Sequence, residues 1–171
     1  MQIFCSQNIH RQTIEMTRMN NRIPDGWEEI SSIGGVVEGT RFIAFRAPLS
    51  WRSDWNLAKL KETVRAETGQ ELTHIIDLTH TDRYYSPSLC TSLGISHTKI
   101  HVPGHVIPGQ ELVDQFYRAV EAASKDEKGL IGVHCTHGLN RSDYVGTLSI
   151  PNIHDLFHLS TFYFFILRSI R

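Results

Sequence analysis

The sequence predicts an α/β fold in which a central, mostly parallel sheet is flanked by helices. Three short apolar runs, at residues 73–78, 97–102 and 129–135, have the length and the β-branched content of buried strands. Two amphipathic segments, 54–68 and 111–124, alternate with these runs along the chain. Strands that alternate with helices are joined by crossover connections, which leave the strands parallel and place helices on both faces of the sheet.

The N-terminal part of the chain carries weaker patterns. Residues 1–21 are polar and have no helical or strand period, so we expect a flexible arm that precedes one folded domain, residues 22–171. Two adjacent glycines, Gly34 and Gly35, predict a turn. Residues 40–48 then predict a strand that ends at a proline.

The two amphipathic segments are expected to be helices that cover the sheet. Asp54 is the expected N-cap of the first helix, and Gly69 follows its last residue as a stop signal. Each segment carries apolar residues at helical spacing. They are Leu57, Leu60 and Val64 in the first segment, and Leu112, Phe116, Val120 and Ala123 in the second.

Composition limits the classes of protein to which the chain can belong. With 171 residues the chain is long enough for one domain with a real core. Its net charge of −1 excludes a protein that coats nucleic acid with a broad basic surface, but it allows a local basic pocket for one end of an RNA. Its 3 scattered cysteines predict no disulfide framework and a reducing, intracellular compartment. The apolar stretch 156–167 is too short to span a bilayer, so we expect a buried helix and no membrane contact.

The most informative stretch is HCTHGLNRS, residues 134–142, in which an arginine and a hydroxyl follow a cysteine after five residues. The strand before it places Cys135 at the carboxyl edge of the sheet, where open α/β sheets bind ligands. Gly138 allows the next loop to curl so that successive N–H groups form an anion nest, and a helix that begins within the motif points its dipole at the same place. The sequence therefore predicts an anion site at Cys135.

The side chains of this motif suit phosphate transfer. The nest, the dipole and Arg141 together favour the thiolate of Cys135, which is the nucleophilic form. Arg141 offers a planar fork for two phosphoryl oxygens, and Ser142 can donate a hydrogen bond to the sulfur as it leaves a phosphocysteine. A buried structural cysteine is the competing interpretation, and the preceding strand and the internal glycine argue against it. The expected phosphate ligands in the loop are Thr136, His137, Gly138, Leu139, Asn140 and Arg141.

Three stretches of the chain together resemble one family. HCTHGLNRS, IIDLTHTDRYY at residues 75–85 and RIPDGWEEI…GTRFIAFRAPL at residues 22–49 are similar to the metazoan RNA 5′-triphosphatase group of cysteine phosphatases. Within that group the dual-specificity-like RNA/RNP-complex-interacting phosphatases resemble the chain more than the triphosphatase domains of mRNA capping enzymes do. The resemblance implies a cysteine-phosphatase fold, no metal or other cofactor, and removal of the γ and β phosphates of 5′-triphosphorylated RNA. It also implies RNA-processing or RNP proteins as partners, and a place in the nucleus or the cytoplasm. We expect the enzyme to be a monomer.

The stretch HVPGHVIPGQE, residues 101–111, supports such a substrate on chemical grounds. Cysteine phosphatases that act on phosphotyrosine or phosphoserine use a general acid, usually an aspartate about thirty residues before the cysteine. This stretch contains no aspartate. A phosphoanhydride leaves as a phosphate, which needs an acid much less. We therefore expect an anhydride substrate, with His105 as the available proton donor.

Four further residues are candidates. Arg83 and Lys99 are placed to grip the outer phosphates, although solvated surface charge is the commoner role of such residues. Asp77 follows a buried strand and either orients the phosphate loop or acts as a structural cap. His134, directly before the nucleophile, is expected to support the same loop.

The chain departs from the family pattern after Ser142. Asp143 stands where the family has glycine, and residues 143–171 are expected to form a divergent, shortened C-terminus. A carboxylate beside the anion site opposes both the thiolate and the substrate. Three functions therefore stay open: an RNA 5′-tri/diphosphatase that works through a phosphocysteine, a dual-specificity protein phosphatase, and a catalytically weak module that binds triphosphate ends or a protein. Turnover of triphosphorylated RNA against phosphopeptide separates the first two, and binding without turnover identifies the third.

Overall fold

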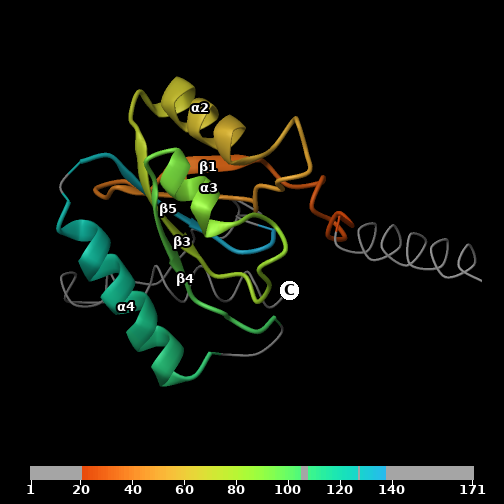
Figure 1. Ribbon diagram of the computed structural model, residues 1–171. Coiled ribbons are helices and arrows are strands. Elements are labelled where there is room, and N and C mark those ends of the chain that lie inside the picture. The colour runs from red at the N-terminus through yellow and green to blue at the C-terminus, as the bar shows by residue number, and fades with distance from the viewer. Residues whose placement is uncertain (1–20, 105–107, 127, 138–171) are drawn as a thin grey trace, which may run out of the picture.

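The computed structural model describes residues 21–104, 108–126 and 128–137. Its sheet has the strand order β1-β2-β5-β3-β4 (Figure 1). Only the pair β1–β2 is antiparallel, whereas β2–β5, β5–β3 and β3–β4 are parallel, so the predicted mostly parallel α/β sheet is confirmed. The strands are β1 (Ile33–Val36), β2 (Phe42–Phe45), β3 (Leu72–Asp77), β4 (Ser96–Lys99) and β5 (Leu130–His134).

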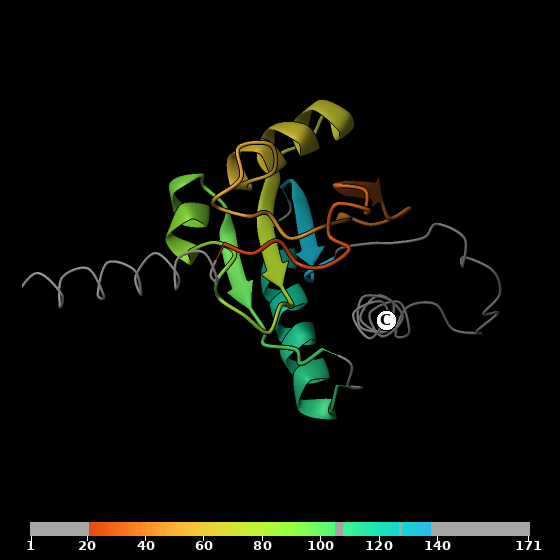
Figure 2. The ribbon, with the colours of Figure 1, turned by 90° about the vertical axis from the view of Figure 1, so that its right-hand side faces the viewer.

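Helices cover both faces of this sheet. Helix α4 (Gln110–Ser124) packs on one face, and α2 (Leu57–Thr68) and α3 (Pro87–Ser92) pack on the other (Figures 1 and 2). Each face has its own apolar cluster, and strand residues alternate between them because side chains of a strand point to opposite faces. Ile131 and Val133 of β5, for example, contact the α4 side, whereas Leu130 contacts the α2 side.

The sequence located β2, β3, β4, β5 and the two long helices to within a few residues, and two of its local expectations were wrong. The pair Gly34–Gly35 lies inside β1 and not in a turn; β1 is an edge strand whose register with β2 shifts between Ile33 and Val36, and such irregular edges accept glycine. The N-cap of α2 is Asn56, whose side chain accepts from the Lys59 N–H at 3.1 Å. Asp54 instead pairs with Arg52.

Helix α3 was not predicted from the sequence. It has 6 residues and begins with Ser86 as the N-cap and Pro87 in its first turn. Two expectations fall beyond the part of the chain that the structure describes: the arm within residues 1–20 and the C-terminal residues 143–171 with the helix at 156–167. Within that part, none of the helices has both the length and the apolarity that crossing a bilayer requires.

Gly132, in the middle of β5, has no room for a side chain. A Cβ atom there would lie 2.9 Å from Leu72 Cδ1 and closer still to the ring of Phe45, which is itself fully buried. We expect Gly132→Ala to lower the free energy of unfolding by about 1–3 kcal/mol, because the packed core must shift to admit the methyl group. Urea denaturation measures this change. Gly35→Ala is the control, because a Cβ at Gly35 meets nothing within 4 Å; equal losses in the two variants would contradict the prediction.

Candidate active site

The candidate nucleophile follows the central strand of the sheet. Strand β5 lies between β2 and β3, parallel to both, and all its residues are buried. Cys135 comes directly after His134, the last residue of β5, so it lies at the carboxyl edge of the sheet with 6% of its surface exposed. This is the edge at which parallel sheets bind their ligands.

Neighbouring segments hold the first residues after the strand in place. The Leu78 N–H donates to the His134 carbonyl at 2.8 Å, which continues the pairing of β3 and β5 past the end of β3. The Ala47 N–H donates to the Thr136 carbonyl at 3.3 Å, and the Tyr84 hydroxyl contacts Thr136 Oγ1 at 3.3 Å. The beginning of the predicted phosphate loop is therefore attached to segments on both sides of β5.

His134 is fully buried and forms two hydrogen bonds that fix its tautomer. Its Nδ1 lies 3.1 Å from the Cys135 carbonyl, which can only accept, so Nδ1 carries the proton. Its Nε2 then accepts from the Tyr85 hydroxyl. Burial lowers the pKa of His134, so the ring is neutral at pH 7 and supports the backbone of the nucleophile without adding charge.

Asp77, the last residue of β3, is the centre of a buried polar network. Its carboxylate accepts from the Thr79 N–H at 2.8 Å, from the Thr79 hydroxyl at 2.7 Å and from the Lys99 ammonium at 3.0 Å. Burial by itself would raise the pKa of Asp77, but the groups around the carboxylate hold this pKa well below its usual range. These groups are His134, His97, Lys99 and Thr79. Of these groups, Lys99 brings an ammonium within 3.0 Å of the carboxylate and so supplies the compensating charge.

Lys99 lies within this network, which differs from its predicted role. Besides Asp77, its ammonium donates to Thr79 Oγ1 at 2.5 Å and to the Thr81 carbonyl at 2.7 Å. An ammonium has three protons, and all three have protein acceptors here. The predicted grip of Lys99 on an outer phosphate is therefore at odds with its position, because that grip would break the support of Asp77.

The other predicted phosphate ligands lie in different surroundings. The Arg83 guanidinium carbon lies 5.1 Å from the ring centroid of Tyr84, the residue that contacts Thr136, so Arg83 is close to the loop. His137 Nε2 lies 2.8 Å from the Asp25 carbonyl oxygen, so this nitrogen faces the N-terminal segment. The remaining candidates lie outside the described residues. They are His105, Gly138, Leu139, Asn140, Arg141 and Ser142.

Several polar residues near these candidates had no direct signal in the sequence. Asp82, in the loop after β3, accepts from His101 Nε2 at 3.0 Å beyond the end of β4, and the His80 ring lies 6.2 Å from the His101 ring. The one available signal was position, because all three residues follow the ends of β3 and β4. In the described ranges, no cluster of three or more histidine, cysteine, aspartate or glutamate side chains is placed to hold a metal ion.

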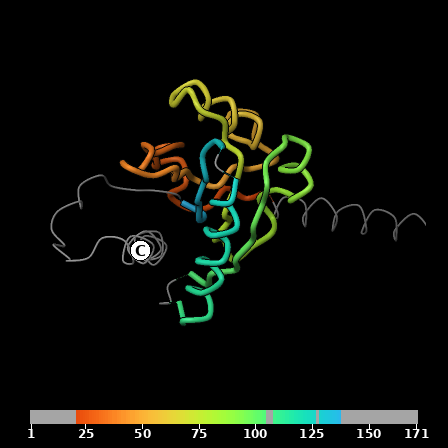
Figure 3. Tube along the Cα trace, turned by 90° about the vertical axis from the view of Figure 1, so that its left-hand side faces the viewer, coloured from red at the N-terminus to blue at the C-terminus, as the bar shows by residue number. Residues whose placement is uncertain are grey.

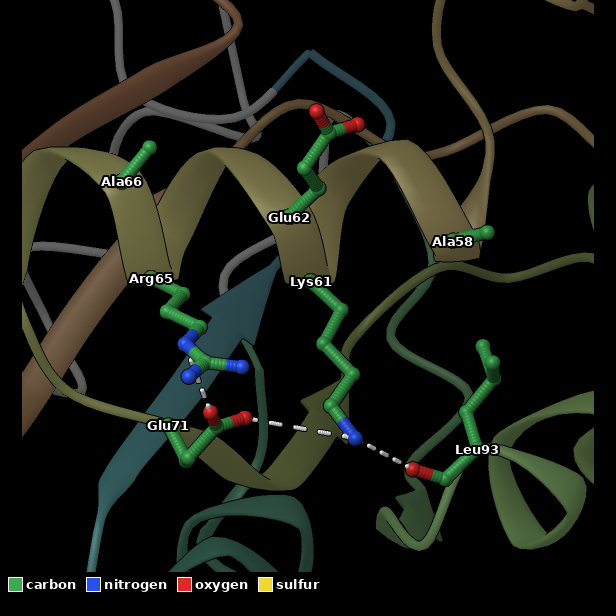
Figure 4. Close-up of a pocket in the computed structure, with 7 residues that line it drawn as sticks. All are labelled: Ala58, Lys61, Glu62, Arg65, Ala66, Glu71 and Leu93. Atoms are coloured by element: carbon green, nitrogen blue, oxygen red, sulfur yellow. Dashed lines mark hydrogen bonds and ion pairs between the residues drawn. The ribbon is translucent and has the colours of Figure 1, made fainter.

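A shallow depression beside α2 lies at the opposite end of the strands (Figure 4). Its cations are already paired: Lys61 Nζ donates to the Leu93 carbonyl at 2.7 Å, and Arg65 Nε lies 3.3 Å from a Glu71 carboxylate oxygen. Glu71 precedes β3, at the amino edge of the sheet, whereas Cys135 follows β5 at the carboxyl edge. The depression is therefore separate from the candidate active site.

The sheet order, the helices on both faces and the cysteine at the end of the central strand define the cysteine-phosphatase fold. The chain is 40% identical over 136 residues to the human RNA/RNP complex-1-interacting phosphatase, which covers 73% of this chain and 41% of the relative. It is 36% identical over 137 residues to the homolog of that phosphatase from Caenorhabditis elegans, covering 72% of this chain and 59% of the relative. The chain thus spans about two fifths to three fifths of the length of these relatives.

A viral relative matches over more of its own length. The putative tyrosine-protein phosphatase 1 of the Orgyia pseudotsugata multicapsid polyhedrosis virus is 32% identical over 157 residues, covering 83% of this chain and 68% of the relative. A crystal structure of a mutant form of Tk-PTP covers 65% of each chain at 20% identity, with a TM-score of 0.47. No family model matches the chain. The chain belongs to the phosphatase family that contains the RNA/RNP complex-1-interacting phosphatases and these viral tyrosine-protein phosphatases.

Proposed function

We propose that the chain is an RNA 5′-polyphosphatase that removes the γ phosphate, and then the β phosphate, from 5′-triphosphorylated RNA through a phosphocysteine. The observation that carries this proposal is the segment between β4 and α4, residues 100–109. It contains no aspartate, although the nucleophile is present at the end of β5. A phosphoanhydride can leave without a strong acid, whereas the alkoxide of a phosphoserine cannot.

The contacts of three carboxylates in the described part of the chain support this reasoning. Asp77 lies on the strand next to β5, but its lowered pKa keeps it ionised at pH 7, so it has no proton to give. Asp82 is turned toward His101 and Lys99, from which its Oδ1 lies 3.0 and 3.7 Å away. Asp114, on α4, accepts from the Gln110 side chain at 2.8 Å. Each of these carboxylates is therefore hydrogen-bonded or ion-paired to another group of the protein.

The reaction proceeds in two displacement steps. The Cys135 sulfur attacks the γ phosphorus, an S–P bond forms, and the bond to the bridging oxygen breaks, so that RNA diphosphate leaves with the electron pair. Water then attacks the phosphocysteine; an O–P bond forms, the S–P bond breaks with its electrons returning to sulfur, and the water proton passes to solvent base. Arg141 holds the equatorial oxygens in both steps, and Ser142 donates to the departing sulfur. No metal ion takes part.

Phosphate release tests the proposal. The chain is incubated in a metal chelator with 5′-triphosphorylated RNA and, separately, with a phosphotyrosine peptide and a phosphoserine peptide. We expect kcat/KM to be at least about tenfold higher for the RNA than for the peptides, because the anhydride needs no acid. A factor of ten corresponds to a difference of about 1.4 kcal/mol in activation free energy. Faster release from the peptides would refute the proposal. Binding of RNA without any release would indicate a binding module.

A protein phosphatase is the second candidate, because the viral relatives are named tyrosine-protein phosphatases. It uses the same nucleophile, and a phenoxide needs an acid less than an alkoxide does. The phosphotyrosine arm of the experiment above decides between the two candidates. The name of the human relative also leads us to propose an RNP complex as a partner.

A further inference from the structure

The N-terminal segment contains a tight turn beside the candidate phosphate loop. The Trp27 N–H donates to the Pro24 carbonyl at 3.1 Å, which closes a four-residue turn over Asp25 and Gly26. Gly26 has φ +72°, and a positive φ at the third position is the mark of a type II turn. A Cβ at Gly26 would meet nothing within 4 Å, so the conformation and not the available space calls for glycine.

This turn is joined to the loop at two places. The Asp25 carbonyl accepts from His137 Nε2 at 2.8 Å, across 112 positions of sequence. Two residues further on, the buried indole N–H of Trp27 donates to the Ala47 carbonyl at 2.9 Å, and the N–H of Ala47 donates to the Thr136 carbonyl. The N-terminal segment is therefore connected to both residues that follow the nucleophile, directly to His137 and through Ala47 to Thr136. Figure 3 shows this segment beside the end of β5.

The turn type decides where the Asp25 carbonyl points. Types I and II differ mainly in the peptide between the two central residues, which is rotated by about 180° while the ends of the turn stay in place. That peptide is Asp25–Gly26, and its carbonyl is the acceptor for His137. An L-residue at position 26 favours type I and turns this carbonyl away.

We propose that the Pro24–Trp27 turn is part of the active site, and that Gly26 and His137 are positioning residues that set the start of the phosphate-binding loop through the Asp25 carbonyl. This inference rests on the proposed function to the extent that the loop binds phosphate. It also gives His137 a different role from that of a cationic phosphate ligand. His137 Nε2–H holds the loop by donating to a backbone oxygen, for which the charge of the ring is not needed.

The first test compares two glycines in equivalent turns. Gly39 also has φ +72° and is also the third residue of a turn, in which the Thr40 N–H donates to the Val37 carbonyl at 3.0 Å. A Cβ at Gly39 would meet nothing within 4 Å, as at Gly26. Affinity for inorganic tungstate, a phosphate-like anion, is measured by calorimetry, with kcat/KM for p-nitrophenyl phosphate as the second readout. We expect Gly26→Ala to lose about tenfold in both, the value of one hydrogen bond, and Gly39→Ala to lose less than twofold. Equal changes in the two variants would overturn the inference.

The second test replaces His137 by two amides. The side-chain nitrogen of glutamine reaches the position of Nε2, whereas that of asparagine reaches only the position of Nδ1. We expect tungstate affinity to fall about tenfold in His137→Asn and to return to within threefold of the original chain in His137→Gln. A cationic ligand would be lost equally in both variants, and that result, or no loss in either, would overturn the inference.

Failure of the proposed function would look different. An original chain that binds tungstate but releases no phosphate from RNA would remove the RNA substrate. The tungstate pattern of the glycine and amide variants would still decide whether the turn positions the loop. Thermal unfolding of each variant accompanies the binding measurement, so that affinity is compared only between folded chains.

Discussion

Replacing Cys135 by serine is expected to stop phosphate release from 5′-triphosphorylated RNA, with a loss in kcat on the order of 10⁴-fold or more. A serine hydroxyl stays protonated near neutral pH, and the adjacent imidazole of His134 is not available as a base. Its Nδ1 donates to the Cys135 carbonyl, and its Nε2 accepts from the Tyr85 hydroxyl. Ala47 and Tyr84 hold the beginning of the loop through hydrogen bonds to Thr136, and the substitution at Cys135 leaves the atoms of these bonds unchanged. RNA binding should therefore persist in the variant.

The matched control for this experiment is Cys90→Ser. Cys90 is fully buried among the side chains on the α2 side of the sheet, and burial raises the pKa of its thiol to about 12, so it stays protonated and unreactive. We expect this variant to keep its kcat once folded. Phosphate release is measured with each variant at equal concentrations of folded chain. Residual turnover in Cys135→Ser at the rate of Cys90→Ser would remove Cys135 from the mechanism.

Replacing Asp77 by alanine is expected to lower the free energy of unfolding by about 3–5 kcal/mol. The change removes the buried charge partner of the Lys99 ammonium, whose side chain is 16% exposed, and leaves it only the exposed Asp82 carboxylate at 3.7 Å. It also removes the acceptor of the Thr79 N–H. Asp82→Ala is the control, because Asp82 is exposed and such pairs contribute less than about 1 kcal/mol. Urea denaturation at pH 7 measures both losses; a loss for Asp77→Ala no larger than that for Asp82→Ala would contradict the prediction.

The pH dependence of Asp77→Asn provides a further check on the same carboxylate. The pKa of Asp77 is lowered in the folded chain, so its ionisation stabilises the fold fully above the unfolded pKa of about 4, and this stabilisation is lost as the pH falls through the folded pKa. The difference in free energy of unfolding between the original chain and Asp77→Asn should therefore be constant from about pH 6 to 8, where the pH is about 2 units or more above the unfolded pKa. It should narrow below about pH 4. A difference that widens in acid would contradict the assigned sign.

The sequence predicted the parts of this molecule whose cause is local. The apolar runs that became β3 and β5 are buried on both faces, and such strands have the same appearance in any context. The position of Cys135 followed from the strand before it. Strand β1 was missed because Gly34 and Gly35 favour a turn, and only pairing with β2 makes them a strand.

The roles of Lys99 and His137 could not be predicted from their neighbours in sequence. Lys99 is a surface cation by composition, and its three acceptors come from the segment 77–81, more than fifteen residues earlier in the chain. His137 lies in the motif and so resembles a phosphate ligand, but its partner is a backbone carbonyl in the N-terminal segment. Backbone acceptors carry no residue type, so no sequence pattern marks them.

The central position of β5 has a consequence for how the chain reaches its folded state. The two halves of the sheet, β1–β2 and β3–β4, are separated by β5 and do not pair with each other. Strand β5 is also the last of the five described strands to be synthesised. Until residues 130–134 leave the ribosome, β2 and β3 each present an unpaired edge, which invites association with other chains. Insertion of β5 closes both edges in one event and brings Cys135 to its place, so a nascent chain acquires its nucleophile and loses its aggregation-prone edges at the same moment.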